Sequence, residues 1–407
     1  MKQIAYLILL FILFVVVSPL RAQTPTTAID YYNRGIERKA KGDLDGAIAD
    51  YTKAIELKPE LVEAYNNRGN ARKAKGDLDG AFADYTKVIE MDPRYATAYA
   101  GRGIARADKG DLDGAISDFN KAIEIDPRDS NTYNNRGNAR KTKGDLDGAI
   151  ADYIRAIEID PLQPNAYYNR GVARADKADF DGAIADYTKA IAIDPRDVDA
   201  YIGRGLARYR KGDDDGAIAD YNKALEINPD YANAYAQRGL VKLRKGKDAE
   251  AQQDFDIALK IDPSGKTVLE DEINKIKQSL SMGRALADNY DGVVRNNKGD
   301  YDGAIACFTQ AIEINPQFAG AYYGRGVARA AKGDYDGAIT DYSKYLEISP
   351  AQADGYARRG FAKLRQSKDA EAQQDFDAAI KIDPNYEASL QKQINEIKQS
   401  RKSKPKP

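Results

Sequence analysis

The 407-residue sequence contains no histidine, no tryptophan and a single cysteine, Cys307. Without histidine, the Ser-His and Cys-His arrangements of nucleophilic catalysis are impossible, and so is every metal site that uses an imidazole ligand. A lone cysteine can form neither an intramolecular disulfide nor a thiolate cluster. Acidic, lysine or tyrosine side chains could still act as acid or base, but such a site needs an irregular constellation, and nearly all of this chain is repeat. The sequence therefore predicts a protein that is not an enzyme and that holds no cofactor and no metal.

An excess of charge of either sign is also lacking. The 62 basic residues stand against 63 acidic ones, which gives a formal net charge of −1. Proteins that bind nucleic acid concentrate basic side chains on one face, and such a face usually leaves the domain clearly basic. We therefore expect no nucleic-acid partner.

The only long apolar run lies at the N-terminus, where Ile4 to Val17 follow the basic Lys2. A short basic start, an apolar run of this length and a small residue at Ala22 are typical of a secretory signal peptide, and the run is short for a membrane-spanning helix. We expect residues 1–22 to be cleaved and the protein to be periplasmic or secreted. If the segment stays uncleaved, it is expected to anchor the chain to the inner membrane, which is the one membrane contact that the sequence suggests.

Proline recurs at a fixed interval of 34 residues. Seven such prolines run from Pro59 to Pro263, and three more run from Pro316 to Pro384. The two series are separated by 53 residues. A period in this range predicts a stacked repeat architecture rather than separate globular domains.

Small and aromatic residues also recur at fixed positions within the period. When the proline is placed at position 32, the first repeat runs from Ala28 to Leu61. In all ten repeats position 8 is Gly, position 20 is Ala and position 24 is Tyr or Phe, as in Gly69, Ala81 and Tyr85. The small residues let two helix backbones approach closely, and the ring fills the space beside them.

This pattern of Gly, Ala, aromatic residue and Pro resembles the tetratricopeptide repeat, and the resemblance covers residues 28–386. It implies an all-α fold: an α-solenoid, wound as a right-handed superhelix, of about ten 34-residue helix-turn-helix repeats. To these repeats the sequence adds two capping helices. The predicted organisation is a signal peptide at 1–22, seven repeats at 28–265, a cap helix and hinge at 266–284, three repeats at 285–386, a cap helix at 387–401 and a basic disordered tail at 402–407.

A larger duplication supports the two caps. The seventh and tenth repeats share the segment Lys-Asp-Ala-Glu-Ala-Gln-Gln-Asp-Phe-Asp, which starts at Lys247 and at Lys368. A similar tail follows each copy, and in the first tail Leu269 and Ile273 begin a narrow aliphatic stripe. Such a stripe is typical of a terminal helix that covers the end of a stack. The segment Ser281–Gly283 is the expected hinge between two arrays that fold independently.

Eight repeats contain Asp-x-Asp-Gly, as at Asp43 to Gly46, which is similar to part of a calcium-binding EF-hand loop. The flanking ligands are wrong, because the first loop position is Lys in all eight repeats and the twelfth is never Glu. We interpret these segments as turns in which Asp caps the second helix.

Arg at position 7 and Asp at position 23 are each present in nine repeats. The eighth repeat loses both at once, with Asp291 and Cys307 instead. One interpretation is a basic ladder for an acidic ligand, and the other is an internal ion pair, such as Arg68 with Asp84 or Asp50. The joint loss favours the ion pair.

The resemblance implies that a ligand lies in the concave groove lined by first-helix positions 2, 5, 9, 12 and 13. In repeats two and four these positions carry amides, which can pair with an extended peptide backbone. In repeats five to seven they carry apolar anchors, which usually supply most of the affinity. The alternative is that these side chains are merely solvated or pack against neighbouring helices. The candidate groove residues are Asn66, Asn70, Lys73, Asn134, Asn138, Lys141, Tyr168, Leu206, Tyr209, Arg210, Leu240 and Leu243.

The expected function is a non-enzymatic protein–protein interaction scaffold that binds a protein or peptide in this groove, outside the cytoplasm. The alternative is binding of a cell-wall polymer or polysaccharide through the groove lined by Asn and Tyr.

Overall fold

The computed structural model describes residues 25–402, which contain 21 α-helices, one short 3-10 helix and no β-strand within that range. Its described residues divide into two compact units, residues 25–238 and residues 239–402. The predicted signal peptide and the tail from residue 403 lie outside the described residues. Among the described helices, none combines the length and apolar character that crossing a membrane requires.

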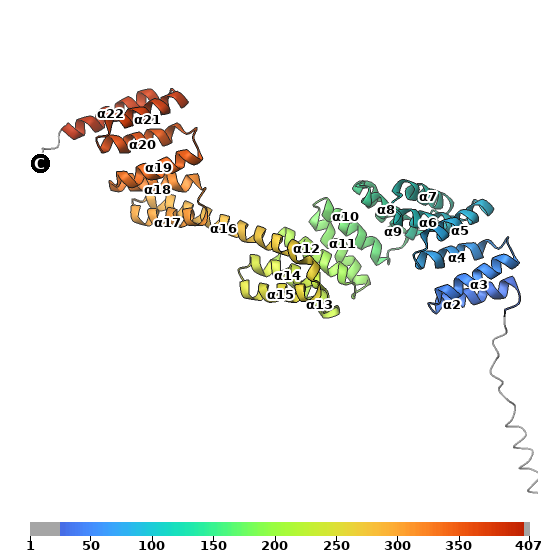
Figure 1. Cartoon of the computed structure of the whole chain (residues 1–407). Coiled ribbons are helices and arrows are strands. Elements are labelled where there is room, and N and C mark those ends of the chain that lie inside the picture. The colour runs from blue at the N-terminus through green and yellow to red at the C-terminus, as the bar shows by residue number, and fades with distance from the viewer. Residues whose placement is uncertain (1–24, 403–407) are drawn as a thin grey trace, which may run out of the picture. The chain divides into compact units, whose positions relative to one another are not determined.

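The first unit consists of antiparallel helix pairs, one pair to each 34-residue repeat (Figure 1). The first helices are α2 (Ala28–Ala40), α4 (Val62–Ala74), α6 (Ala96–Asp108), α8 (Ser130–Thr142), α10 (Pro164–Asp176) and α12 (Val198–Lys211). The second helices are α3 (Leu44–Leu57), α5 (Leu78–Met91), α7 (Leu112–Ile125), α9 (Leu146–Ile159), α11 (Phe180–Ile193) and α13 (Asp214–Ile227). Helix α14 (Ala232–Arg244) begins in this unit and ends in the second.

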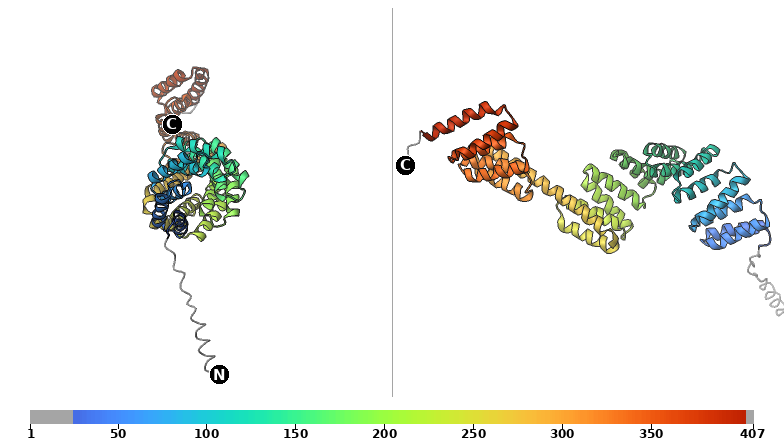
Figure 2. Two further views of the ribbon diagram at one scale, coloured as in Figure 1. Left: turned by 90° about the vertical axis from the view of Figure 1, so that its right-hand side faces the viewer. Right: turned by 45° about the horizontal axis from the view of Figure 1, so that its top comes forward.

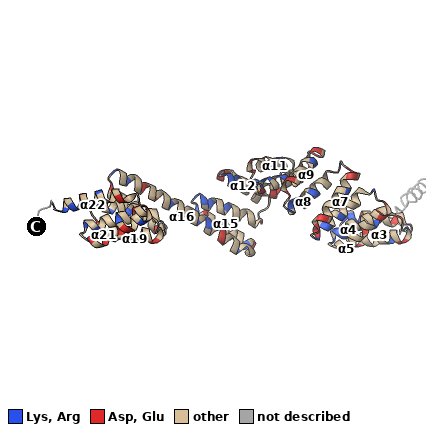
Figure 3. Ribbon diagram, turned by 90° about the horizontal axis from the view of Figure 1, so that it is seen from above, with Lys and Arg blue, Asp and Glu red and all other residues tan. Residues whose placement is uncertain are grey.

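The second unit repeats the same pairing and ends in an additional helix. Its elements are α15 (Asp248–Ile261), the 3-10 helix η1 (Pro263–Gly265), α16 (Lys266–Asn297), α17 (Tyr301–Ile314), α18 (Ala319–Lys332), α19 (Tyr335–Ile348), α20 (Ala353–Arg365), α21 (Asp369–Ile382) and α22 (Tyr386–Lys402). Basic and acidic side chains are interspersed along the helices of both units (Figure 3). The all-α solenoid predicted from the period is confirmed.

The turn between the two helices of a repeat follows from its sequence. In the second repeat Gly76 has φ +83°, a left-handed conformation that Gly adopts without steric cost. Asp77 is the N-cap of α5, and its Oδ1 accepts a 2.9 Å hydrogen bond from the backbone N–H of Gly80. The same Asp cap begins eight second helices, so the interpretation of Asp-x-Asp-Gly as a capping turn is confirmed.

The packing order of the helices determines which face of the stack is concave. Each first helix in the first unit packs against its own second helix, and from α4 onward also against the second helix of the preceding repeat. Neighbouring first helices also touch, as α4 touches α6 and α6 touches α8, whereas the described second helices of neighbouring repeats form no comparable contact. The row of pairs is therefore curved with its first helices on the inside, and the curvature of residues 25–238 is visible in Figure 2.

The core of each repeat is the ring at position 24. Tyr85 is fully buried between the helices of its repeat, beside Ala81 and Val88. A Cβ atom added to Gly69 would lie 2.9 Å from the Tyr85 ring, which is closer than side chains normally approach. Glycine at position 8 is thus required by the close approach of the first helix to this ring.

The predicted hinge at Ser281–Gly283 is not a break in the chain's secondary structure. Helix α16 runs without interruption through these residues, and its C-terminal part packs against α17 as the first helix of the eighth repeat. The first cap and that helix are therefore one element, which explains why 21 rather than the expected 22 helices are found in the described residues. A single Gly costs a helix only about 1 kcal/mol relative to Ala, and no proline interrupts the segment. Independent folding of the two predicted arrays remains a prediction.

Helix α22 packs against α20 and α21 and covers the end of the last repeat. Leu390, Ile394 and Ile397 of α22 are buried in one cluster with Leu364 and Phe376. These aliphatic side chains are spaced at four and three residues, as expected for a narrow apolar stripe on a helix with an otherwise polar surface.

Candidate functional site

The arginines at position 7 do not form a ligand surface, because each is engaged within the stack. Arg68 Nη2 lies 2.7 Å from Oδ1 of the buried Asp84, in the same repeat. A second cation that the sequence analysis did not consider, Arg72 at position 11, places its Nη1 2.8 Å from Asp84 Oδ2. The prediction of an internal ion pair is confirmed. The same pairing joins Arg34 to Asp50, Arg102 to Asp118, Arg136 to Asp152, Arg170 to Asp186, Arg204 to Asp220, Arg325 to Asp341 and Arg359 to Asp375.

The position-7 arginine also links neighbouring repeats. Arg68 Nη1 donates a 3.1 Å hydrogen bond to Thr52 Oγ1 of the preceding repeat, and its guanidinium lies 5.5 Å from the centre of the Tyr65 ring. One side chain therefore holds the carboxylate of its own repeat, the hydroxyl of the previous one and an aromatic face. This use of Arg is structural, and it leaves the concave surface to other side chains.

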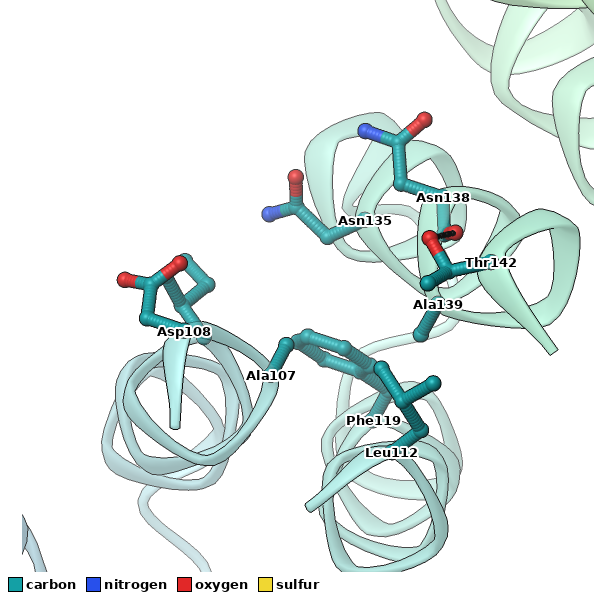
Figure 4. A pocket seen from close by; sticks show the side chains of 9 residues that line it. Ala107, Asp108, Leu112, Phe119, Asn135, Asn138, Ala139 and Thr142 are labelled. Atoms are coloured by element: carbon teal, nitrogen blue, oxygen red, sulfur yellow. Dashed lines mark hydrogen bonds between the residues drawn. The ribbon is translucent and has the colours of Figure 1, made fainter. Parts of the chain in front are cut away.

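A hollow of about 260 Å³ lies on the concave side between α6 and α8 (Figure 4). The Phe119 ring and Leu112 form its apolar floor, while the carboxylate of Asp108 and the amide of Asn135 stand on opposite sides of it. The complete lining is Ile104, Ala107, Asp108, Leu112, Phe119, Asn135, Asn138, Ala139 and Thr142. The hollow combines an apolar floor with a polar rim, which is typical of a site for part of a peptide.

Two of the predicted amides are held in a fixed orientation by buried tyrosines. Tyr85 donates its hydroxyl hydrogen to Asn70 Oδ1 at 2.7 Å, and Tyr153 donates to Asn138 Oδ1 at the same distance. Burial raises the pKa of both phenols above the ordinary value of 10.0, so each hydroxyl remains a donor at neutral pH. With the oxygen engaged, the Nδ2 group of each asparagine is left as a donor on the concave side, and neither donates a hydrogen bond within the described part of the chain.

Lys73, one turn from Asn70 on the same helix, is an incompletely compensated cation. Burial lowers its pKa, and the charge of Lys39 acts in the same direction, while the charge of Asp108 opposes the shift. Lys73 forms no ion pair within residues 25–402. Lys141 occupies the equivalent position of the fourth repeat and is half-buried. A ligand that brings negative charge to this part of the groove would offset the energetic cost of burying the Lys73 charge.

The two amides at position 5 are buried instead of lining the groove. Asn134 accepts a 3.0 Å hydrogen bond from Asn169 Nδ2 of the next repeat, so it fastens one first helix to its neighbour. Asn66 lies at the equivalent site, but the next repeat has Gly101 where Asn169 stands, and Asn66 Oδ1 has no partner among the described residues. The prediction that Asn66 and Asn134 are groove surface is therefore wrong, because position 5 turns towards the adjacent first helix.

The predicted apolar patch is only partly available. Leu206 is 38% exposed, Arg210 is exposed, and Tyr168 and Tyr209 are half-buried. The remaining two members lie in the second unit, where Leu240 and Leu243 are each only 4% exposed. Their prediction as ligand anchors is wrong, because aliphatic side chains that packing removes from water cannot also be offered to a partner.

Position 6 was not considered in the sequence analysis, and it belongs to the concave surface. A Cβ atom added to Gly101, at position 6 of the third repeat, would lie 2.7 Å from the Tyr85 ring of the second repeat. This position therefore faces the ring of the preceding repeat, and Asn135 occupies it beside the hollow. The available signal was that this position is either Gly or an amide in each of the first seven repeats.

Comparison with known proteins gives consistent results. A family model described as TPR repeat matches residues 35–76, 69–110, 105–144, 137–178, 173–212 and 205–246, and models described as tetratricopeptide repeat match residues 232–264 and 297–353. None of the curated proteins matches this sequence.

Several solved structures are similar to parts of the chain. The crystal structure of MamA is 31% identical, with the match covering 40% of this chain and 96% of MamA at a TM-score of 0.38. YrrB, described as a TPR protein with an unusual peptide-binding site, is 26% identical, with 48% and 97% covered and a TM-score of 0.39. A tetratricopeptide repeat protein from Parabacteroides merdae is 21% identical, with 61% and 98% covered and a TM-score of 0.48.

Proposed function

Because the chain belongs to the tetratricopeptide-repeat family, a family of protein–protein interaction scaffolds, we propose that it is a non-enzymatic scaffold that binds an extended segment of another protein in the concave groove of repeats two to six. The observation that carries this proposal is the pair of oriented amides. Asn70 and Asn138 occupy the same position two repeats apart, and each has its oxygen engaged by a buried tyrosine. Two donors fixed on one concave surface suit the carbonyl oxygens of an extended backbone.

The surroundings of the amides define the rest of the ligand. The hollow beside Asn138 has an apolar floor that suits a side chain of the bound segment. Lys73 beside Asn70 favours a segment that carries a negative charge near this end of the groove. Leu206, exposed two repeats further on, offers an apolar anchor at the other end. Such anchors commonly contribute about 2 kcal/mol or more to an interface, whereas a hydrogen bond exchanged with water contributes roughly 0.5–1.5 kcal/mol.

We propose further that the scaffold works outside the cytoplasm, in the periplasm or as a secreted protein. The support is the N-terminal sequence alone, with its basic start, apolar run and Ala22. Labelling the accessible compartment of intact cells and sequencing the N-terminus of the purified protein test both the location and the cleavage.

The binding proposal is tested with the chain from residue 23 onward, immobilised and exposed to envelope extract. The expected result is retention of protein partners that is reduced in the double variant Asn70→Ala with Asn138→Ala. Asn297→Ala, an exposed Asn on α16 outside the groove of repeats two to six, is the matched control and should retain them. Co-sedimentation with purified peptidoglycan tests the alternative, that the groove binds a cell-wall polymer or polysaccharide. Retention on the polymer that the groove substitutions abolish, with no protein partner, would replace the proposal by polysaccharide binding.

A further inference from the structure

A second hollow, of about 350 Å³, lies in the second unit between α18 and α20. It has the same place in its repeat pair as the hollow between α6 and α8, because each of the nine residues that line the first has its counterpart 223 positions later in the lining of the second. Two further residues, Gln393 and Ile397, come from the cap helix α22 and add a wall that the first hollow lacks. The complete lining is Val327, Ala330, Ala331, Tyr335, Tyr342, Arg358, Phe361, Ala362, Arg365, Gln393 and Ile397.

Seven of the nine shared positions carry different residues, and three of these exchanges change the charge of the lining. Asn135 is replaced by Arg358, Thr142 by Arg365, Asn138 by Phe361 and Asp108 by Ala331. The first hollow therefore has one charged residue, which is acidic, whereas both charged residues in the lining of the second are arginines. The exchange of Asn138 for Phe361 adds an aromatic ring to the lining of the second hollow.

Both arginine side chains of the second hollow are exposed. Arg358 Nε donates a 2.8 Å hydrogen bond to Asp354 Oδ2, and this carboxylate also accepts the hydroxyl hydrogen of Tyr323. The Arg358 side chain remains 43% exposed, and its guanidinium lies over the Tyr323 ring, 5.4 Å from the ring centre. Arg365 is exposed and forms no ion pair within residues 25–402. Arginine binds carboxylates through a planar fork of donors, and both side chains are exposed enough to meet one.

We propose that this hollow, outside the groove of repeats two to six, binds an acidic peptide segment. An apolar side chain of the segment enters the space between Val327, Phe361 and Ile397. Flanking Asp or Glu carboxylates pair with Arg358 and Arg365 at the rim. The hollow's volume is at the lower end of the roughly 300–1,000 Å³ typical of ligand pockets, which suits one side chain with its neighbouring backbone. The two hollows would then let one scaffold hold two chemically different segments.

The test uses fluorescence anisotropy with the chain from residue 23 onward and two labelled model peptides of equal length. In one peptide a central leucine is flanked by glutamates, and in the other the same leucine is flanked by glutamines. The glutamate peptide is expected to bind more tightly, and its affinity should fall as salt is added. Equal affinity for the two peptides, or no binding of the glutamate peptide, overturns the proposal.

The variants identify the hollow as the place of binding. Arg365→Gln, whose side chain has no ion-pair partner to lose, should weaken the glutamate peptide about tenfold, as expected for one charge-assisted hydrogen bond. Arg358→Gln should act in the same direction, with circular dichroism confirming that the fold is retained. Arg128→Gln removes the same charge from an exposed position of the first unit and should change nothing. An unchanged affinity in Arg365→Gln, or an equal loss in Arg128→Gln, contradicts the assignment. Asn70→Ala should leave this binding intact, which separates it from the function proposed for the groove.

Discussion

Arg68 and Asp84 form a two-pronged ion pair inside the second repeat, with Nε 3.0 Å from Oδ2 and Nη2 2.7 Å from Oδ1. Asp84 is buried, and Arg72 approaches its second oxygen from the next turn of the same first helix. One carboxylate of the second helix is therefore shared by two cations of the first helix. The repetition of this cluster along the chain makes it a recurring fastener between the two helices of a repeat.

Removing the shared carboxylate should be costly. We expect Asp84→Ala to destabilise the second repeat by about 3 kcal/mol or more, because two partly buried guanidinium groups lose their partner. Hydrogen exchange at the amides of α4 and α5 measures the loss locally, which suits a repeat protein that opens unit by unit. Asp79→Ala is the control, since Asp79 pairs with Lys109 on the surface and should contribute about 1 kcal/mol or less. Similar losses of stability in both variants would show that the buried cluster contributes no more than a surface ion pair.

The eighth repeat offers the reverse experiment. Asp291 and Cys307 occupy the positions of the arginine and the aspartate, and Arg295 remains as the second cation. We expect Asp291→Arg combined with Cys307→Asp to stabilise this repeat more than the sum of the single substitutions, with a coupling of about 1–3 kcal/mol. Chemical denaturation of the four proteins of the cycle gives the coupling. Additive effects would mean that the pair does not form when it is restored.

A left-handed residue in the fifth repeat also predicts a stabilising change. Ala178 has φ +60° at the turn position where Gly76 has φ +83°. A residue with a Cβ atom pays roughly 1–2 kcal/mol in this conformation, so Ala178→Gly should raise stability by about 1 kcal/mol and Gly76→Ala should lower it by a similar amount. Thermal unfolding of the two variants and of the parent protein shows whether each substitution raises or lowers the stability as expected. A destabilised Ala178→Gly variant would contradict the assigned backbone conformation.

The groove lysine predicts a dependence on pH. Burial lowers the pKa of Lys73 from the ordinary 10.5, so the folded state disfavours its charged form. Below the folded pKa the lysine is charged in both states, and the full desolvation penalty opposes folding. As the pH rises through the folded pKa towards 10.5, that penalty is lost. Lys73→Met should therefore stabilise the fold at neutral pH, with a gain that shrinks in alkaline solution. Lys87→Met, which replaces an exposed lysine, is the control and should show no such gain. If the stability gain of Lys73→Met does not depend on pH, it comes from better packing of Met and not from the removed charge.

Binding should depend more on Leu206 than on the amides. We expect Leu206→Ala to weaken a bound protein segment by about tenfold or more, and Asn70→Ala or Asn138→Ala to weaken it less, because the apolar anchor loses buried area while each amide exchanges one hydrogen bond with water. Titration of the partner recovered from the envelope extract measures all three. Larger losses at the asparagines would favour a polar ligand such as a polysaccharide.

The sequence predicted the parts of this structure that are set by local chemistry repeated many times. The Gly, Ala and ring of each repeat fix how its two helices meet, and the Asp at each turn fixes where the second helix begins. The Arg68–Asp84 pair was also predictable, since the eighth repeat loses both members together. In each case the pattern of a single repeat contains the whole interaction.

Features that depend on two neighbouring repeats were not predictable in the same way. Asn134 is buried where Asn169 of the next repeat donates a hydrogen bond to it, and no periodic pattern shows which amides meet in this way. Leu240 is covered, although it occupies the same repeat position as the exposed Leu206. The unbroken α16 joins a predicted cap to a predicted first helix, because each segment was assigned separately and nothing between them stops a helix.

The central claim, that the concave groove binds a segment of another protein, is tested most directly by site-specific photo-crosslinking in the native envelope. A photoreactive phenylalanine derivative is placed at Leu206 in the groove, and at Ala185, an exposed residue of the second helix α11, as the control. The account predicts a peptide adduct of one defined protein at position 206, identified by mass spectrometry, and no such adduct at position 185. Adducts at position 185 alone, or none at position 206, would contradict the account.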